Sequence, residues 1–156
     1  MKKVFLSMMS ILMVAMLCVG FASCSKDDDN AGSLAYDANN PIIGSWYHSE
    51  IDGSQENETL LMLYSNGKFK LLERVPYRHG GYEDYEDVVV EGRYEYEDGT
   101  LYLTITKSND SDFVVGNMLE MDVMSLNRNR LVVESYSDEY DDFVETGFVR
   151  TEQTSL

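Results

Sequence analysis

Residues 88–97 read VVVEGRYEYE, and they form the clearest alternating stretch in the chain. Apolar and aromatic residues from Val88 to Tyr96 share one face of an extended chain, and charged residues share the other. Alternation with a period of two residues is typical of a β-strand with one buried face. Asp98-Gly99 follows and favours a tight hairpin turn into the next alternating stretch, residues 101–106.

The same alternation recurs on both sides of this hairpin, without a convincing helical periodicity. It predicts eight strands, at residues 42–48, 59–64, 68–75, 88–97, 101–106, 119–124, 130–136 and 143–151. Residues 77–87 contain two glycines and follow Pro76, so we expect a loop there. Short connections predict an all-β, antiparallel, eight-stranded up-and-down barrel, because closure removes both sheet edges. A two-sheet β-sandwich is the alternative, since it buries the same faces.

Charge and composition exclude several classes of protein. The 156 residues include 12 basic and 28 acidic side chains, for a formal net charge of −16, which argues against nucleic-acid binding. Hydrophobic residues make up 44% of the chain, enough for the packed core of one domain. Two cysteines and two histidines are too few for a disulfide scaffold or a Cys/His zinc site.

The N-terminus has the features of a bacterial export signal. Lys2 and Lys3 precede an apolar run that ends near Phe21, and a retained membrane helix is the alternative interpretation. The small residues directly before Cys24 resemble a lipobox, the recognition site of the lipoprotein signal peptidase. The resemblance implies that residues 1–23 are a signal peptide cleaved after Ser23, and that Cys24 is lipidated and N-acylated.

We expect residues 24–40 to form an acidic flexible tether between this lipid anchor and a barrel domain at 41–156. The triplet Asp27, Asp28 and Asp29 resembles the signal that sends lipoproteins to the outer leaflet of Gram-negative bacteria. It implies an outer-membrane protein exposed at the cell surface. Retention on the periplasmic face is the alternative, with the three acids serving only as a solvated linker.

The first strand carries a second resemblance. Gly44-Ser45-Trp46 at the start of an eight-strand meander resembles the Gly-x-Trp motif that opens lipocalins. The later segments LYSNGKF (63–69), EGRYEY (91–96) and NRLVV (129–133) are similar to lipocalin-like domains of bacterial surface lipoproteins. The likeness covers about residues 41–152. It implies that Trp46 lies at the closed base of the barrel under an arginine of the last strand, for which Arg150 is the candidate.

Several side chains are candidates for a pocket inside the barrel. Tyr64, Tyr94 and Tyr96 have apolar neighbours and could contact a ligand, although strand packing alone also explains them. Leu103 and Met121 are further candidates for the pocket wall. Gly44 and Gly92 have no side chain, so we expect a void to open beside them.

Catalysis and metal binding have weaker support. The acidic runs at 83–87 and 138–142 lack the ligand spacing of a calcium loop, so solvated loops are favoured and no metal site is predicted. His48 and His79 lie in no nucleophile motif, and we expect the acids of the strands on outward faces, away from a catalytic dyad.

We therefore expect a monomeric binding protein for a small hydrophobic ligand, with no cofactor, rather than an enzyme. An interaction module is the alternative, with a packed barrel and acidic loops that contact another envelope or host protein.

Overall fold

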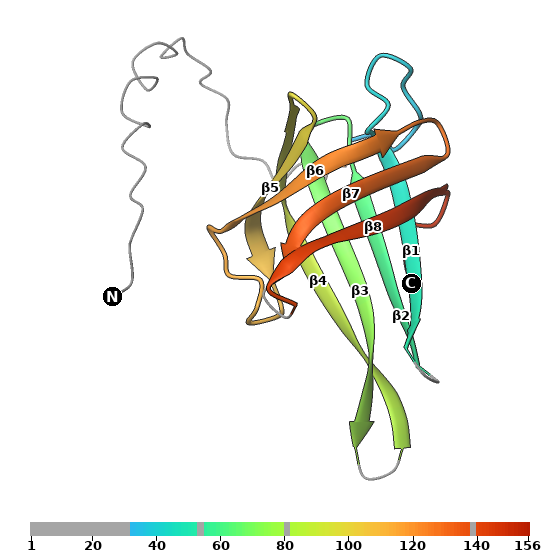
Figure 1. Cartoon of the computed structure of the whole chain (residues 1–156), viewed down its shortest axis with the longest axis vertical. Coiled ribbons are helices and arrows are strands. Elements are labelled where there is room, and N and C mark those ends of the chain that lie inside the picture. The colour runs from blue at the N-terminus through green and yellow to red at the C-terminus, as the bar shows by residue number, and fades with distance from the viewer. Residues whose placement is uncertain (1–31, 53–54, 80–81, 138–139) are drawn as a thin grey trace.

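The computed structural model is a closed, eight-stranded antiparallel β-barrel (Figure 1). It describes residues 32–52, 55–79, 82–137 and 140–156. The strands are β1 (Gly44–Asp52), β2 (Gln55–Leu63), β3 (Lys68–His79), β4 (Tyr82–Glu97), β5 (Thr100–Ser108), β6 (Met118–Leu126), β7 (Arg130–Ser137) and β8 (Asp142–Thr151). Within these ranges there is no helix long and apolar enough to cross a membrane.

Each strand pairs with its neighbour in sequence, and the last strand returns to the first. β1 pairs with β2 along its whole length, and it pairs with β8 on its other side through Trp46 and Arg150 among others. This single ring of strands confirms the predicted up-and-down barrel. It also excludes the two-sheet sandwich.

The expectation of a loop at residues 77–87 is wrong. β3 and β4 pair continuously as far as His79 and Tyr82, and this hairpin extends beyond the rest of the barrel in Figure 1. Pro76 is tolerated because the pairing of β3 with β2 ends at Arg74, so Pro76 lies where β3 has a free edge.

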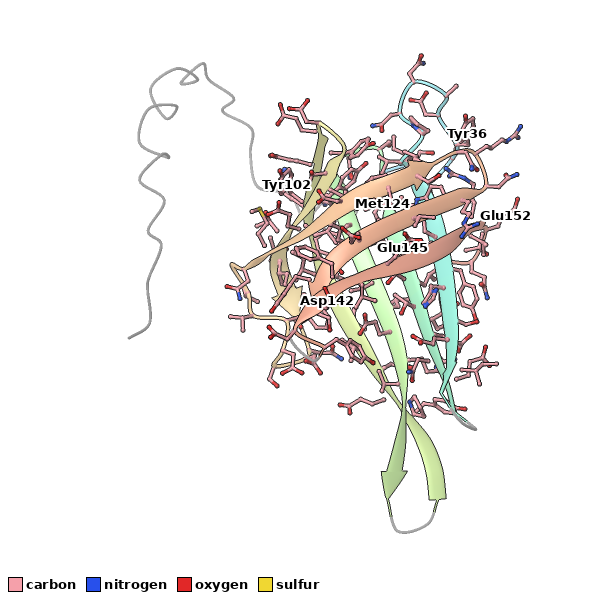
Figure 2. The ribbon with its side chains drawn as sticks, viewed as in Figure 1. Tyr36, Tyr102, Met124, Asp142, Glu145 and Glu152 are labelled. Carbon is pink, nitrogen blue, oxygen red and sulfur yellow. The ribbon has the colours of Figure 1, made fainter. Side chains whose placement is uncertain are left out.

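Alternate residues of the strands fill the barrel, mainly toward the end where β1 begins. The core contains Ile42, Trp46, Leu61, Leu63, Phe69, Leu71, Val88, Val90, Tyr94, Leu101, Leu103, Ile105, Leu131, Val133 and Phe148. Most side chains on the other face of the strands are exposed, as the labelled Met124 and Glu145 illustrate (Figure 2), whereas Leu60 and Met62 of β2 are buried there. Tyr96, expected to point inward, is 38% exposed because β4 ends one residue later.

The expectation of voids beside Gly44 and Gly92 is also wrong. A Cβ at Gly92 would lie 2.0 Å from the Thr104 carbonyl oxygen and 2.6 Å from the Phe69 ring. The pairing of β4 with β5 shifts register at this point, so the glycine accommodates a close approach of two backbones. The space at Gly44 is occupied by the guanidinium of Arg150.

The chain before β1 lies against the barrel, within the segment expected to be a tether. The Ser33 amide donates a hydrogen bond to the Ser65 hydroxyl, and the Ser65 amide donates one to the Ser33 carbonyl, both at 2.9 Å. These contacts extend the packed domain beyond the predicted boundary at residue 41. The cleavage and lipidation residues Ser23 and Cys24, and the triplet 27–29, lie outside the described residues.

Candidate functional site

One end of the barrel, here called the base, is sealed by Trp46 and Arg150. Trp46 has no exposed surface, and its indole N–H donates a 2.8 Å hydrogen bond to the Ile42 carbonyl. The Arg150 guanidinium lies 4.1 Å from the centre of the Trp46 ring, and it donates to the carbonyls of Ile43 at 2.7 Å and Pro41 at 2.8 Å. Arg150 therefore has the position that the lipocalin resemblance implied for it.

Tyr36 completes the base from the segment before β1. The Arg150 guanidinium carbon is 5.1 Å from the Tyr36 ring centre, and that of Arg128 is 5.4 Å from it. Burial lowers the pKa of Arg150 from its ordinary value, and the positive charge of Arg128 lowers it further. No strand pattern marks Tyr36 in the sequence, because it precedes the first strand and acts through its contact with two arginines.

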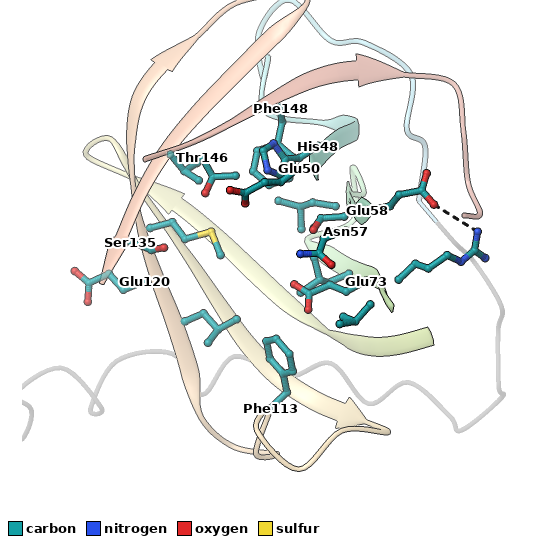
Figure 3. Close-up of a pocket in the computed structure, with 18 of the residues that line it drawn as sticks. His48, Glu50, Asn57, Glu58, Glu73, Phe113, Glu120, Ser135, Thr146 and Phe148 are labelled. Carbon is teal, nitrogen blue, oxygen red and sulfur yellow. Dashed lines mark ion pairs between the residues drawn. The ribbon is translucent and has the colours of Figure 1, made fainter. Parts of the chain in front are cut away.

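The opposite end of the barrel, here called the mouth, contains a cavity of about 660 Å³. Its walls come from β1, β2, β3, β6, β7 and β8, and from Phe113 in the connection between β5 and β6. Figure 3 shows the side chains that surround it. The lining residues are His48, Glu50, Asn57, Glu58, Thr59, Leu61, Leu71, Glu73, Arg74, Val75, Phe113, Met118, Leu119, Glu120, Met121, Val133, Ser135, Tyr136, Thr146 and Phe148.

The cavity continues the same inward faces that build the core. On β3 the inward face runs from buried Phe69 and Leu71 to Glu73, and on β1 it runs from Trp46 to His48 and Glu50. These inward side chains are apolar near the base, and polar side chains join apolar ones such as Val75 toward the mouth. The cavity therefore has an apolar floor and a mixed upper wall.

Glu73 corrects the expectation that every strand carboxylate points outward. It lines the cavity, and its position in phase with Phe69 and Leu71 was visible in the sequence. Burial raises the pKa of Glu73, and the negative charge of Asp110 raises it further. No hydrogen bond or ion pair to the Glu73 carboxylate is found in the described part of the chain.

His48 is held in a fixed orientation on the cavity wall. Its Nδ1 lies 2.8 Å from the Gly147 carbonyl oxygen, and its ring packs against Phe148 with centroids 5.6 Å apart. A carbonyl can only accept, so Nδ1 carries the proton of this hydrogen bond. In the neutral imidazole, Nε2 is then an acceptor.

Among the described lining residues, Arg74 is the only lysine or arginine. Its guanidinium forms ion pairs with two carboxylates. It lies 3.5 Å from a carboxylate oxygen of Glu58 and 3.0 Å from one of Asp87. Tyr47 donates a further 2.8 Å hydrogen bond to Glu58. These side chains alternate with the inward ones, so the arginine belongs to an ion-pair network along the outer face.

The predicted ligand-binding residues separate into two groups. Met121 lines the cavity, whereas Tyr64, Tyr94, Tyr96 and Leu103 are not among the lining residues. Leu103 is fully buried, and the Tyr94 hydroxyl donates a 2.9 Å hydrogen bond to the Tyr64 carbonyl. Burial raises the pKa of Tyr64 and Tyr94, and the negative charge of Glu91 raises that of Tyr64 further.

Within the described residues, no group of three or more histidine, cysteine, aspartate or glutamate side chains could hold a metal ion. Comparison of the chain with protein-family models and with curated proteins finds no match.

Proposed function

We propose that this protein is a lipid-anchored protein of the cell envelope whose barrel binds a small hydrophobic ligand at its mouth. The observation that carries the proposal is the cavity of about 660 Å³, opposite a base sealed by Trp46 and Arg150. Sites for small molecules have volumes of roughly 300–1,000 Å³. The closed eight-stranded barrel is also consistent with the lipocalin-like resemblance of the sequence.

The floor of the cavity provides the apolar contact that such a ligand needs. Leu61, Leu71, Met121, Val133 and Phe148 come from five different strands and surround the same space. Side chains that face an unfilled cavity lack dispersion partners on that side. A ligand that fills the space supplies those contacts and removes its own apolar surface from water.

The lipid anchor is supported by the sequence alone, through the lipobox-like residues before Cys24. Residues 32–40 reach the barrel at its base, where Ser33 contacts Ser65 and Tyr36 contacts Arg150. An anchor at Cys24 would hold the barrel by its closed end. On this proposal the mouth is directed away from the outer membrane. The protein then lies at the cell surface or, alternatively, on the periplasmic side.

Binding of N-phenyl-1-naphthylamine tests the proposed function, because this neutral fluorophore brightens in apolar surroundings. We expect the purified protein to bind it with a dissociation constant of roughly 1 μM. Met121→Trp fills the cavity and should weaken binding about tenfold or more. Met124→Trp is the matched control, since Met124 lies on the same strand and is 56% exposed.

A second candidate function is supported by exposed apolar side chains at the mouth. They are Val114, Val115, Met118, Tyr140 and Phe143, and each is more than half exposed. Exposed apolar patches commonly mark sites of protein interaction. If the fluorophore does not bind, or if Met121→Trp and Met124→Trp bind it equally well, the interaction module becomes the better explanation.

A further inference from the structure

The charges inside the cavity are almost all negative. Its described lining contains four glutamates and one arginine, and that arginine and Glu58 pair with each other along the outer face. Glu50 and Glu73 lie on the inward faces of β1 and β3, in phase with buried core residues. Among the described lining residues, a ligand inside the cavity therefore meets two inward carboxylates and no lysine or unpaired arginine.

Glu73 is the more informative of the two inward carboxylates, because Glu50 is exposed whereas Glu73 is only partly exposed. Burial and the negative charge of Asp110 raise the pKa of Glu73, because they leave its charged form without full compensation. Across the neighbouring strands, Glu73 lies opposite Thr59 on β2 and Val88 on β4. Neither of these side chains carries a positive charge. A cation placed in the cavity would supply that compensation.

Other acceptors surround the same space. Asn57 and Thr59 share the inward face of β2 beside Glu73, and Figure 3 shows Asn57 next to Glu73. On another wall, His48 has Nδ1 committed to the Gly147 carbonyl, so Nε2 is the ring nitrogen that remains for a ligand. Amide, hydroxyl, imidazole and carboxylate acceptors can together satisfy the several N–H donors of an ammonium group.

We propose that the cavity selects an amphiphile with a protonated amine, whose ammonium group binds Glu73 while its apolar part packs on Leu61, Leu71 and Met121. This inference rests on the proposed function and specifies its ligand class. A hydrogen bond to a charged partner is stronger than a neutral one, and strongest where water is excluded. A fatty acid of the same length would instead place a carboxylate among glutamates.

Three probes with the same ten-carbon chain test this selection. Decylamine, decanol and decanoate are each used to displace N-phenyl-1-naphthylamine from the purified protein at pH 7. We expect decylamine to bind about tenfold more tightly than decanoate, with decanol between them. Glu73→Gln keeps the side-chain shape and removes the charge, so it should reduce the preference for decylamine over decanoate about tenfold and leave decanol unchanged.

Glu95→Gln is the control, because it removes one carboxylate from the exposed face of β4 and changes the net charge equally. The inference would be overturned if decanoate bound as tightly as decylamine or more tightly. It would also be overturned if Glu73→Gln left the preference for decylamine unchanged, or if Glu95→Gln reduced that preference as much as Glu73→Gln does. In those cases decanol still binds and the proposed function stands. Failure of all three probes to bind would contradict the proposed function and the inference together.

Discussion

Gly44 and Arg150 are in such close contact that a Cβ on the glycine would lie 2.0 Å from Nη1 of the guanidinium. Gly44 also has a φ of +147°, a conformation that residues with side chains rarely adopt. The first residue of β1 and the next-to-last residue of β8 are thus fitted to each other where the barrel closes. This contact allows the arginine to reach the indole of Trp46 below it.

Gly44→Ala should destabilise the protein by about 3 kcal/mol, because it adds backbone strain and displaces the guanidinium. Gly99→Ala should cost only about 1 kcal/mol, since Gly99 has a φ of +90° but nothing within 4 Å of an added Cβ. Urea denaturation measures both changes. In an Arg150→Ala background the cost of Gly44→Ala should fall toward that of Gly99→Ala. An unchanged cost would show that the arginine is not the obstacle.

Trp46 is the only tryptophan, so its fluorescence reports on the base alone. Full burial predicts a blue-shifted emission maximum in the folded protein. Arg150→Ala removes a cation–π contact of about 0.5–2 kcal/mol and the donors to the Pro41 and Ile43 carbonyls, so the emission should change and stability should fall. Emission in the folded protein at the wavelength of free indole in water would contradict this description of the base.

Glu73 should make the protein less stable as pH rises. Its pKa is raised in the folded state by burial and by Asp110, so the folded protein binds this proton more tightly than the unfolded chain. The free energy of unfolding then decreases as pH rises from the ordinary carboxyl value, about 4, through the raised pKa. Glu73→Gln removes this dependence.

Thermal unfolding at several pH values measures the effect. Glu73→Gln should unfold at a higher temperature than the wild type at pH 7, and the two should converge near pH 3, where the glutamate is protonated in both states. Glu95→Gln serves again as the control for net charge. A variant that is less stable than the wild type at pH 7 would mean that the Glu73 carboxylate has a stabilising partner.

Lipidation at Cys24 is a prediction of the sequence alone. In bacterial cells Cys24→Ala should accumulate as uncut precursor and should not incorporate labelled fatty acid. Cys18→Ala, within the predicted signal peptide, is the matched control and should be processed normally. Normal cleavage of the Cys24→Ala protein would contradict the lipobox interpretation. Replacing Asp27, Asp28 and Asp29 with alanine should reduce protease accessibility on whole cells if the triplet directs surface export.

The alternation of residues was sufficient to predict the barrel, because each strand has one buried face. Residue type and period disagree at two places. The charge of Glu73 favours an outward position, but its spacing from Phe69 and Leu71 puts it on the inward face. Residues 77–87 were expected to be a loop because of Pro76 and two glycines, yet the hairpin is paired on only one side there and tolerates the proline.

The cavity depends on contacts that one strand cannot predict. Leu103 and Met121 both lie on inward faces, but only Met121 lines the cavity, although Met121 pairs with Leu101 and Leu103 pairs with Leu119. The space beside Gly44 is filled by the side chain of Arg150, which lies more than 100 residues later in the sequence. Such long-range packing is absent from the local pattern, so the position of the cavity could not be predicted from the sequence.

Solution NMR of the protein with methyl groups labelled, titrated with decanol, tests the central claim most directly. We predict that the largest shift changes and ligand contacts occur at Leu61, Leu71, Met121 and Val133, which line the cavity. Leu103 in the closed half and Val149 on the outer face should change little. Changes confined to the exposed Val114 and Val115, or no changes on saturation with decanol, would contradict the claim that this barrel binds a ligand inside its mouth.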